Sequence, residues 1–161
     1  MFKYLTRIMG TVLALMLLLN TPALAAEGKI VVEKMDKAGL DRLMQDPNNQ
    51  SMIVAMAAWC GPCRKELPTL VKLFDKYKDQ GLKMVGISLD ANGPQAMQPI
   101  LDKLHVNFPV YWVGVDMARE YDIYAIPMIF FIKNGQVVEK LPGKRSHKDL
   151  DRKIKELFEL P

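Results

Sequence analysis

Apolar residues follow two different patterns along the chain, and the two patterns alternate. Several short runs are apolar at nearly every position, which is typical of strands covered on both faces of a sheet. Other stretches repeat apolar residues every three or four positions, which is typical of amphipathic helices. The predicted strands are 30–35, 52–57, 82–89, 109–113, 128–132 and 136–141, and the predicted helices lie around 40–44, 67–77, 94–105, 116–121 and 150–158. This alternation predicts one α/β domain, a sheet with helices on both faces.

Short turn and capping signals sharpen this arrangement. Asn134-Gly135 lies between two apolar runs and predicts a β-hairpin, since both residues accept a positive φ angle. The sheet is therefore expected to be mixed rather than all-parallel. Ser146, with Asp149 three residues later, resembles a capping box at the start of the last helix, and Asp116 is expected to cap the short helix after it.

The first 25 residues have the pattern of an export signal. Lys3 and Arg7 precede an apolar core at 12–19, and residues 23–25 (Ala-Leu-Ala) have the small-x-small form of a cleavage site. The core is shorter than the roughly 20 apolar residues of a spanning helix. We interpret 1–25 as a signal peptide and 26–161 as the domain, in a periplasmic or otherwise extracytoplasmic protein. An uncleaved membrane anchor is the alternative.

Composition narrows the classes of protein that remain. Half of the 161 residues are apolar and a quarter are charged, with a formal net charge of +4. This hydrophobic content argues against disorder, and two cysteines are too few for a disulfide framework. Basic residues are interleaved with acidic ones, as in the stretch 133–155, and form no clustered stripe. We therefore expect no nucleic-acid partner.

The candidate chemistry lies in Trp59-Cys60-Gly61-Pro62-Cys63, where a predicted strand gives way to a helix. The only two cysteines lie three apart, so both sulfurs fall on the first turn of that helix. Unpaired N–H groups at a helix N-terminus stabilise a thiolate, which makes Cys60 the expected nucleophile and Cys63 the resolving thiol. Gly61 lets a partner approach closely, and Pro62 suits a first-turn position that needs no N–H donor. The pattern predicts thiol–disulfide exchange.

Two cysteines three residues apart can also form a structural disulfide or bind a metal ion. A purely structural disulfide would close too short a loop to constrain the unfolded chain much. Zinc would need two more ligands, and His105 and His147 lack partner spacing. Copper(I) remains an alternative, because two thiolates with a distant histidine or methionine can hold it. We expect no metal and no cofactor other than a Cys60–Cys63 disulfide.

The motif resembles a known family. Trp-Cys-Gly-Pro-Cys is the thioredoxin motif, and its extension resembles the extracytoplasmic TlpA/ResA-type thiol–disulfide oxidoreductases. The resemblance covers about 52–143 and rests on the segments 64–68, 108–110 and 121–127, the Asn134-Gly135 turn and Gly143. It implies a thioredoxin-like three-layer sandwich, with a mixed central sheet and an extra strand-and-helix stretch between 82 and 105. It also implies an enzyme that exchanges disulfides with proteins, in the reducing direction.

The same resemblance implies roles for residues outside the cysteine motif. Pro127 is expected to be cis and to face the two cysteines, so that the Ile126 backbone pairs with an extended substrate segment. An ordinary trans proline at the start of a strand is the alternative. Trp59 is expected to shield the sulfurs and contact partners, to be a half-buried core aromatic, or to be both.

Three further positions bear on the mechanism. Glu66 and Val54 concern proton transfer, and Met128 concerns the substrate groove. The resemblance places Glu66 in the active site, able to raise a thiol pKa or relay a proton, whereas a solvated surface glutamate is the alternative. Val54 stands where thioredoxins bury an aspartate, which leaves the proton acceptor open. Met128 stands after the proline where threonine is usual, and either alters the groove or fills the core.

Four functions follow from these features. The leading one is reduction of disulfides in exported proteins, such as apocytochrome c. The protein is expected to act as a monomer, and a membrane electron donor is expected to regenerate its dithiol. A disulfide-forming oxidase is the nearest alternative. A copper-delivery module is another. A peroxidase is disfavoured because Ala57 stands where peroxiredoxins place a threonine.

Overall fold

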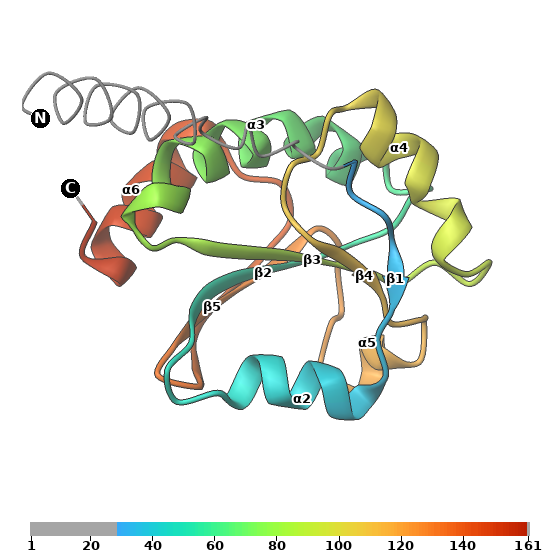
Figure 1. Ribbon diagram of the computed structural model, residues 1–161, viewed down its shortest axis with the longest axis horizontal. Helices are drawn as coiled ribbons and strands as arrows, with labels where there is room; N and C mark the ends of the chain where they lie inside the picture. The colour runs from blue at the N-terminus through green and yellow to red at the C-terminus, as the bar shows by residue number, and fades with distance from the viewer. Residues whose placement is uncertain (1–28, 161) are drawn as a thin grey trace, which may run out of the picture.

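A six-stranded mixed sheet runs through the centre of the protein, whose computed structural model describes residues 29–160 (Figure 1). The strand order is β1-β4-β3-β2-β5-β6. The strands are β1 (Glu33–Lys34), β2 (Gln50–Met56), β3 (Lys83–Ser88), β4 (Val110–Trp112), β5 (Met128–Lys133) and β6 (Gln136–Pro142). The first four are mutually parallel, while β5 and β6 run antiparallel to their neighbours. The predicted mixed sheet is confirmed.

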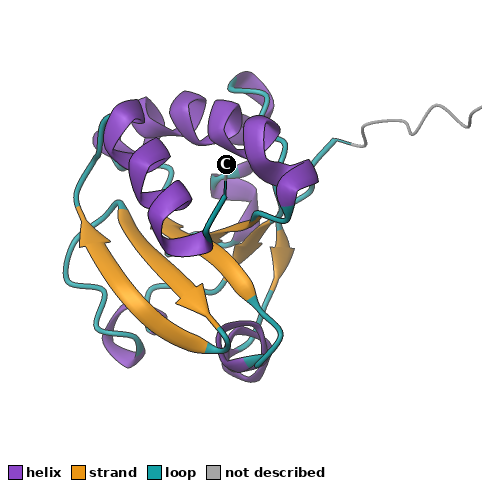
Figure 2. Ribbon diagram, turned by 90° about the vertical axis from the view of Figure 1, so that its left-hand side faces the viewer, coloured by secondary structure: helices purple, strands orange, loops and turns teal. Residues whose placement is uncertain are grey.

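Helices cover both faces of this sheet. They are α2 (Lys37–Gln45), α3 (Gly61–Tyr77), α4 (Gln98–Lys103), α5 (Met117–Glu120) and α6 (His147–Phe158), with 3-10 turns at Lys78–Gln80 and Pro94–Ala96. Helices α3, α4 and α6 lie above the sheet in Figure 1, and α2 and α5 lie below it. Figure 2 shows the same layers from the side. The predicted three-layer α/β sandwich is confirmed.

Each face of the sheet has its own apolar core. Strand β2 is buried over six of its seven residues, and successive side chains point to opposite faces. Met52 and Val54 therefore pack under α3 and α6, whereas Ile53 packs toward α2. Fully burying an aliphatic side chain contributes roughly 1.5–3 kcal/mol. Burial on both faces explains why β2 reads as a continuous apolar run.

Two predicted elements are shorter than the pattern suggested. The strand expected at 30–35 is reduced to Glu33–Lys34, because the Gln98 side chain bonds the backbone before it. Its Oε1 accepts from the Val32 N–H at 2.9 Å, and its Nε2 donates to the Ile30 carbonyl at 2.8 Å. The helix expected at 94–105 is divided into a 3-10 turn and α4. Pro99 fits the first turn of α4 but would break a longer helix at its centre.

The capping and turn predictions had different outcomes. The Ser146 hydroxyl accepts from the Asp149 N–H at 3.1 Å, so this cap is confirmed. Asn134 and Gly135 both have positive φ between β5 and β6, which confirms the hairpin. The Asp116 prediction was wrong, because its side chain makes no capping bond and its backbone is already helical.

The export signal predicted at 1–25 lies outside the described residues. Across 29–160, no helix is both long enough and apolar enough to span a membrane.

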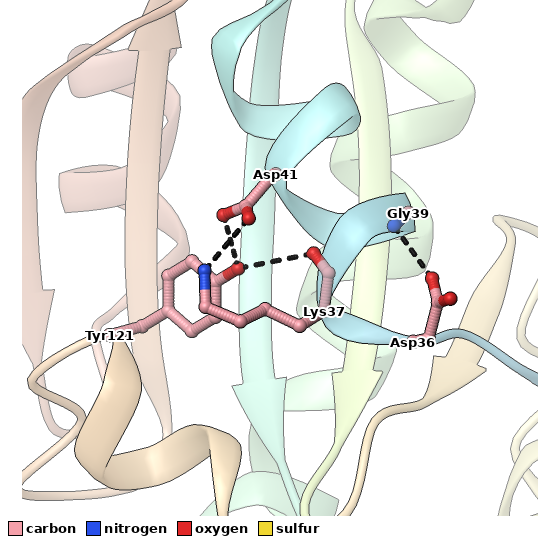
Figure 3. Close-up of polar contacts among 5 residues, drawn as sticks. All are labelled: Asp36, Lys37, Gly39, Asp41 and Tyr121. Carbon is pink, nitrogen blue, oxygen red and sulfur yellow. Dashed lines mark hydrogen bonds and ion pairs between the residues drawn. The ribbon is translucent and has the colours of Figure 1, made fainter.

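A polar cluster ties α2 to the segment that leads toward Ile126 (Figure 3). The Tyr121 hydroxyl donates to Asp41 Oδ1 at 2.7 Å, and the Lys37 ammonium pairs with Asp41 Oδ2 at 2.8 Å. Asp36 caps α2 by accepting from the Gly39 N–H at 2.7 Å. Partial burial and the adjacent Asp41 carboxylate raise the pKa of the Tyr121 hydroxyl, which is therefore neutral and a donor at physiological pH. The cluster joins α2 to the chain after α5.

We expect Tyr121→Phe to lower the midpoint of thermal unfolding by only a few degrees. The variant loses the bond to Asp41, but the Lys37 ion pair remains and the ring still packs. Thermal unfolding followed by circular dichroism measures the change. Tyr124→Phe is the matched control, because the Tyr124 side chain is exposed. Equal midpoints for the two variants would show that the bond from Tyr121 to Asp41 adds nothing to stability.

Candidate active site

One edge of the sheet gathers segments that are distant in sequence. The carboxyl ends of parallel strands meet at the same edge, so β2 and β3 deliver Cys60 and Asp90 there. Strand β5 is antiparallel to β2, with Met128 opposite Ala55, and therefore begins at this edge just after Pro127. Topology thus brings the cysteine motif and the Ile126-Pro127 segment together.

The two cysteines form a disulfide on the first turn of α3. Their Cα atoms lie 5.3 Å apart, and their side chains are 4% and 2% exposed for Cys60 and Cys63. Cys60 is the N-cap residue, and its Sγ accepts from the Cys63 N–H at 3.1 Å. Pro62 occupies the first turn, where no N–H donor is needed. After reduction, the same N–H and the helix dipole stabilise a thiolate on Cys60.

The Ile126-Pro127 peptide lies against the disulfide and is cis, as the resemblance implied. The Ile126 carbonyl oxygen is 3.7 Å from Cys60 Sγ. The Pro127 carbonyl oxygen accepts from the Gly143 N–H at 2.7 Å, which joins this segment to the end of β6. Backbone atoms of Ile126 are therefore in position beside the sulfur that a substrate would approach.

Exposed aromatic and proline side chains flank the disulfide. Trp59 is 70% exposed, so the alternative that it is a half-buried core aromatic was wrong. Pro62 is exposed, and a Cβ placed on Gly61 would meet no described atom within 4 Å other than those of its chain neighbours and its own helix backbone. Tyr124, two residues before Ile126, is 75% exposed. Apolar surface next to a disulfide is suited to contact with another chain.

Glu66 is fully buried one turn after Cys63, so the solvated-surface alternative was wrong. Its Oε1 accepts from the Arg145 N–H at 2.6 Å. Within the part of the chain described, its Oε2 meets no hydrogen-bond donor. Burial raises the pKa of the carboxyl, and the Arg145 N–H and the Lys144 and Arg145 charges offset only part of that rise. A buried carboxyl that holds its proton more tightly is thus present near the thiols.

We expect the wild type to lose stability as the pH rises, and we expect Glu66→Gln not to show this loss. A carboxyl with a raised pKa in the folded state contributes most stability below its ordinary value of 4.5. That contribution is lost as pH rises through the higher folded pKa. Glutamine cannot ionise, so the difference in unfolding free energy should grow in favour of the variant from about pH 4 to 8.

Urea denaturation of the oxidised proteins over this pH range measures the effect, since disulfide-bonded cysteines do not titrate. Glu33→Gln, at an exposed position on β1, is the control and should follow the wild-type curve. If Glu66→Gln also follows it, the Glu66 carboxyl does not titrate differently in the two states.

Asp90 belongs to the site but was missed by the sequence reasoning. It is 2% exposed, and both carboxylate oxygens lie 3.0 Å from the Ala58 nitrogen, whose N–H they share. Ser88 Oγ donates to Asp90 Oδ2 at 2.7 Å, and Trp112 Nε1 donates to the Asp90 carbonyl. An acidic residue directly after a buried strand was the signal that could have found it. Asp90 holds the backbone two residues before Cys60.

The two departures from the family pattern lie inside the cores. Val54 is buried beneath α3, and Met128 is fully buried on the α2 side of the sheet. Met128 therefore fills the core and does not line the surface beside Cys60. The position of thioredoxin's aspartate is apolar here, and Glu66 and Asp90 are the buried carboxyls of this edge.

The thiolates of Cys60 and Cys63 are the groups that could hold a soft metal ion after reduction. Among residues 29–160, no group of three or more His, Cys, Asp or Glu side chains is arranged to hold a metal. A third copper ligand would have to come from elsewhere.

The sheet order, the flanking helices and the cysteine pair at the N-terminus of α3 define a thioredoxin-like protein. The chain belongs to the AhpC/TSA family, whose match spans residues 32–141. Curated relatives include the thiol-disulfide oxidoreductase ResA of Bacillus thuringiensis subsp. konkukian, 28% identical over 101 residues, covering 62% of this chain and 58% of the relative. ResA of a Bacillus cereus strain is 34% identical over 96 residues, covering 58% and 54%. The chain thus spans a little over half the length of these relatives.

Solved structures share the fold. A thiol:disulfide interchange protein of the thioredoxin family from Chlorobium tepidum matches with a TM-score of 0.61 and 25% identity, covering 71% of this chain and 81% of that one. A chain from a structure of the thiol-resolving mechanism in yeast mitochondrial 1-Cys peroxiredoxin via glutathione/thioredoxin systems matches with a TM-score of 0.55 and 24% identity, covering 79% of this chain and 95% of that one. The second likeness concerns the fold alone.

Proposed function

We propose that this protein is a thiol–disulfide oxidoreductase that reduces disulfides in exported proteins. The observation that carries the proposal is the bond from the Cys63 N–H to Cys60 Sγ at the N-terminus of a 17-residue helix. This arrangement lowers the free energy of a Cys60 thiolate, the species that attacks disulfides. The ResA relatives support the same reaction class.

The reaction proceeds in two exchanges. The Cys60 thiolate attacks one sulfur of the substrate disulfide, forming a mixed disulfide and releasing a substrate thiolate, which takes a proton. The Cys63 thiolate then attacks Cys60 Sγ, which re-forms the Cys60–Cys63 bond and releases the second substrate thiolate. Two electrons pass from the protein dithiol to the substrate. The oxidised form is the one described above.

Glu66 is proposed to take the proton of Cys63 during the second exchange. Cys63 is 2% exposed, so its sulfur has almost no contact with water that could take the proton of the thiol. Glu66 lies one turn further along α3, and burial raises the pKa of its carboxyl, which makes its ionised form a stronger base. The pH dependence of mixed-disulfide resolution, compared between wild type and Glu66→Gln, tests this role.

Protein substrates fit the surroundings of the disulfide. The Ile126 backbone beside Cys60 can pair with an extended chain, and the exposed Trp59 and Pro62 side chains offer apolar contact area. We propose that substrates are exported proteins such as apocytochrome c, that a membrane electron donor regenerates the dithiol, and that the protein acts as a monomer outside the cytosol. Without such a donor, a reductant cannot persist in an oxidising compartment.

The decisive test is reduction of insulin by the wild type and by Cys60→Ser in the presence of a thiol reductant. The wild type is expected to accelerate precipitation of the insulin B chain, and the variant is not, because it lacks the attacking thiolate. Equal rates would remove the proposal.

An oxidase that installs disulfides is the nearest second candidate, because stabilising the Cys60 thiolate also makes a disulfide more oxidising. The reduction potential separates the two candidates: the potential of a reductant should be about −270 mV and that of a strong oxidant about −120 mV. Peroxide consumption would point to a peroxidase, despite Ala57 at the threonine position. Stoichiometric Cu(I) binding without disulfide exchange, lost in Cys63→Ser, would point to copper delivery.

A further inference from the structure

A cleft of about 300 Å³ opens next to the cysteine motif, between the first turns of α3 and the end of α4. Figure 1 shows the two helices side by side above the sheet. The residues that line the cleft are Gly61, Arg64, Lys65, Ile100, Lys103 and Leu104. Gly61 directly follows Cys60, so one end of the cleft lies beside the cysteine motif.

The rim of this cleft carries positive charge that no acidic side chain among residues 29–160 pairs with. Arg64, Lys65 and Lys103 are all exposed, and none forms an ion pair with any residue of 29–160. Within the described part of the chain, eight ion pairs join other lysines and arginines to acidic residues. The positive end of the α3 dipole adds to the field at the same place.

The two acidic residues next to Lys65 and Lys103 in the sequence interact with groups outside the cleft. Glu66 follows Lys65, but it is buried and accepts from the Arg145 N–H. Asp102 precedes Lys103, but it pairs with Lys29 at 2.9 Å and accepts from Gln98 at 2.9 Å. The cleft therefore keeps a net positive rim.

The floor of the cleft is apolar. Ile100 and Leu104 are partly buried, and both pack against the core on the α3 side of the sheet. A small free anion would find no polar group on this floor. An apolar side chain flanked by carboxylates can pack on the apolar floor while its carboxylates pair with the cations of the rim.

We propose that this cleft binds an acidic segment of the protein substrate, with an apolar side chain between carboxylates, next to the cysteine that bonds to Cys60. The inference rests on the proposed function and specifies which protein disulfides react fastest. Rim charges chiefly raise the rate of association, and salt screens them.

The test uses peptides that each carry one internal disulfide and differ only in the residues flanking one cysteine: Glu-Leu-Glu, Gln-Leu-Gln or Lys-Leu-Lys. The reduced protein is mixed with each peptide, and the second-order rate constant of the exchange is obtained from the rate of thiol oxidation. We expect the acidic peptide to react about tenfold faster than the basic one at low salt, and the difference to shrink near 1 M salt.

Lys103→Glu is the informative variant, because Lys103 lies on α4 and its change leaves the cysteine motif intact. We expect it to lower the second-order rate constant for the acidic peptide about fivefold and to raise that for the basic peptide. Lys83→Glu is the matched control: Lys83 is exposed and begins β3, at the opposite edge of the sheet from Cys60. It should change both rates by less than about twofold.

Reduction of bis(2-hydroxyethyl) disulfide, an uncharged small substrate, separates the two possible failures. All three proteins should reduce it equally. Suppose that all three proteins reduce the small disulfide equally. The cleft proposal is then overturned if the acidic and basic peptides react at the same rate, or if Lys83→Glu has as large an effect as Lys103→Glu. If Lys103→Glu changes only co-sedimentation with phosphatidylglycerol vesicles, the occupant is an anionic membrane and the proposal is likewise overturned. If the wild type reduces neither peptides nor the small disulfide, the proposed function itself fails.

Discussion

Cys63→Ser is expected to accumulate mixed disulfides with its substrates, and Cys60→Ser is expected to form almost none. Cys60 caps α3, where the Cys63 N–H and the helix dipole stabilise its thiolate. With Cys63 replaced, Cys60 still attacks, but nothing resolves the product. Turnover should fall by at least about two orders of magnitude in both variants, since each loses one of the two exchanges.

Non-reducing electrophoresis followed by mass spectrometry measures the trapped species and names the substrates. The double variant Cys60→Ser/Cys63→Ser controls for non-covalent association. If Cys60→Ser traps partners instead, Cys63 is the attacking residue and the assignment of the two cysteines is reversed.

Asp90→Ala is expected to destabilise the protein by about 3 kcal/mol, because it leaves the Ala58 N–H and the Ser88 hydroxyl buried without their acceptor. Asp90→Asn should cost about 1 kcal/mol, since one amide oxygen can still accept from Ala58. The same changes loosen the backbone before Cys60, so the reduction potential should shift as well.

Urea denaturation of the oxidised protein measures the free energy of unfolding. Asp79→Ala, an exposed aspartate in the 3-10 turn after α3, is the matched control and should change stability by no more than about 0.5 kcal/mol. An Asp90→Ala variant as stable as this control would show that the hydrogen bonds to Ala58 contribute little.

Sequence reasoning located the features that depend on neighbouring residues. The continuous apolar run of β2 indicated a strand buried on both faces, and Asn134-Gly135 predicted the hairpin because its positive φ angles are a local requirement. The spacing of Cys60 and Cys63 after that strand likewise placed both sulfurs on one helical turn. The cis Ile126-Pro127 peptide came from family resemblance rather than from any local pattern.

Tertiary structure decided the features that depend on distant parts of the chain. Whether Glu66 was solvated or buried depended on a backbone N–H at Arg145, 79 positions away. Asp90 became part of the site because β3 lies beside β2, which brings its carboxylate to the Ala58 N–H.

Periodicity and spacing thus determined the reactive pair and the strands and helices other than β1 and α4, because backbone conformation and helical faces arise mainly from residues close in sequence. Only the folded chain decided which carboxyls are buried beside the sulfurs, that Trp59 is exposed, and that three cations surround an open cleft. Burial and electrostatic environment are set by contacts between elements, and no local pattern records them.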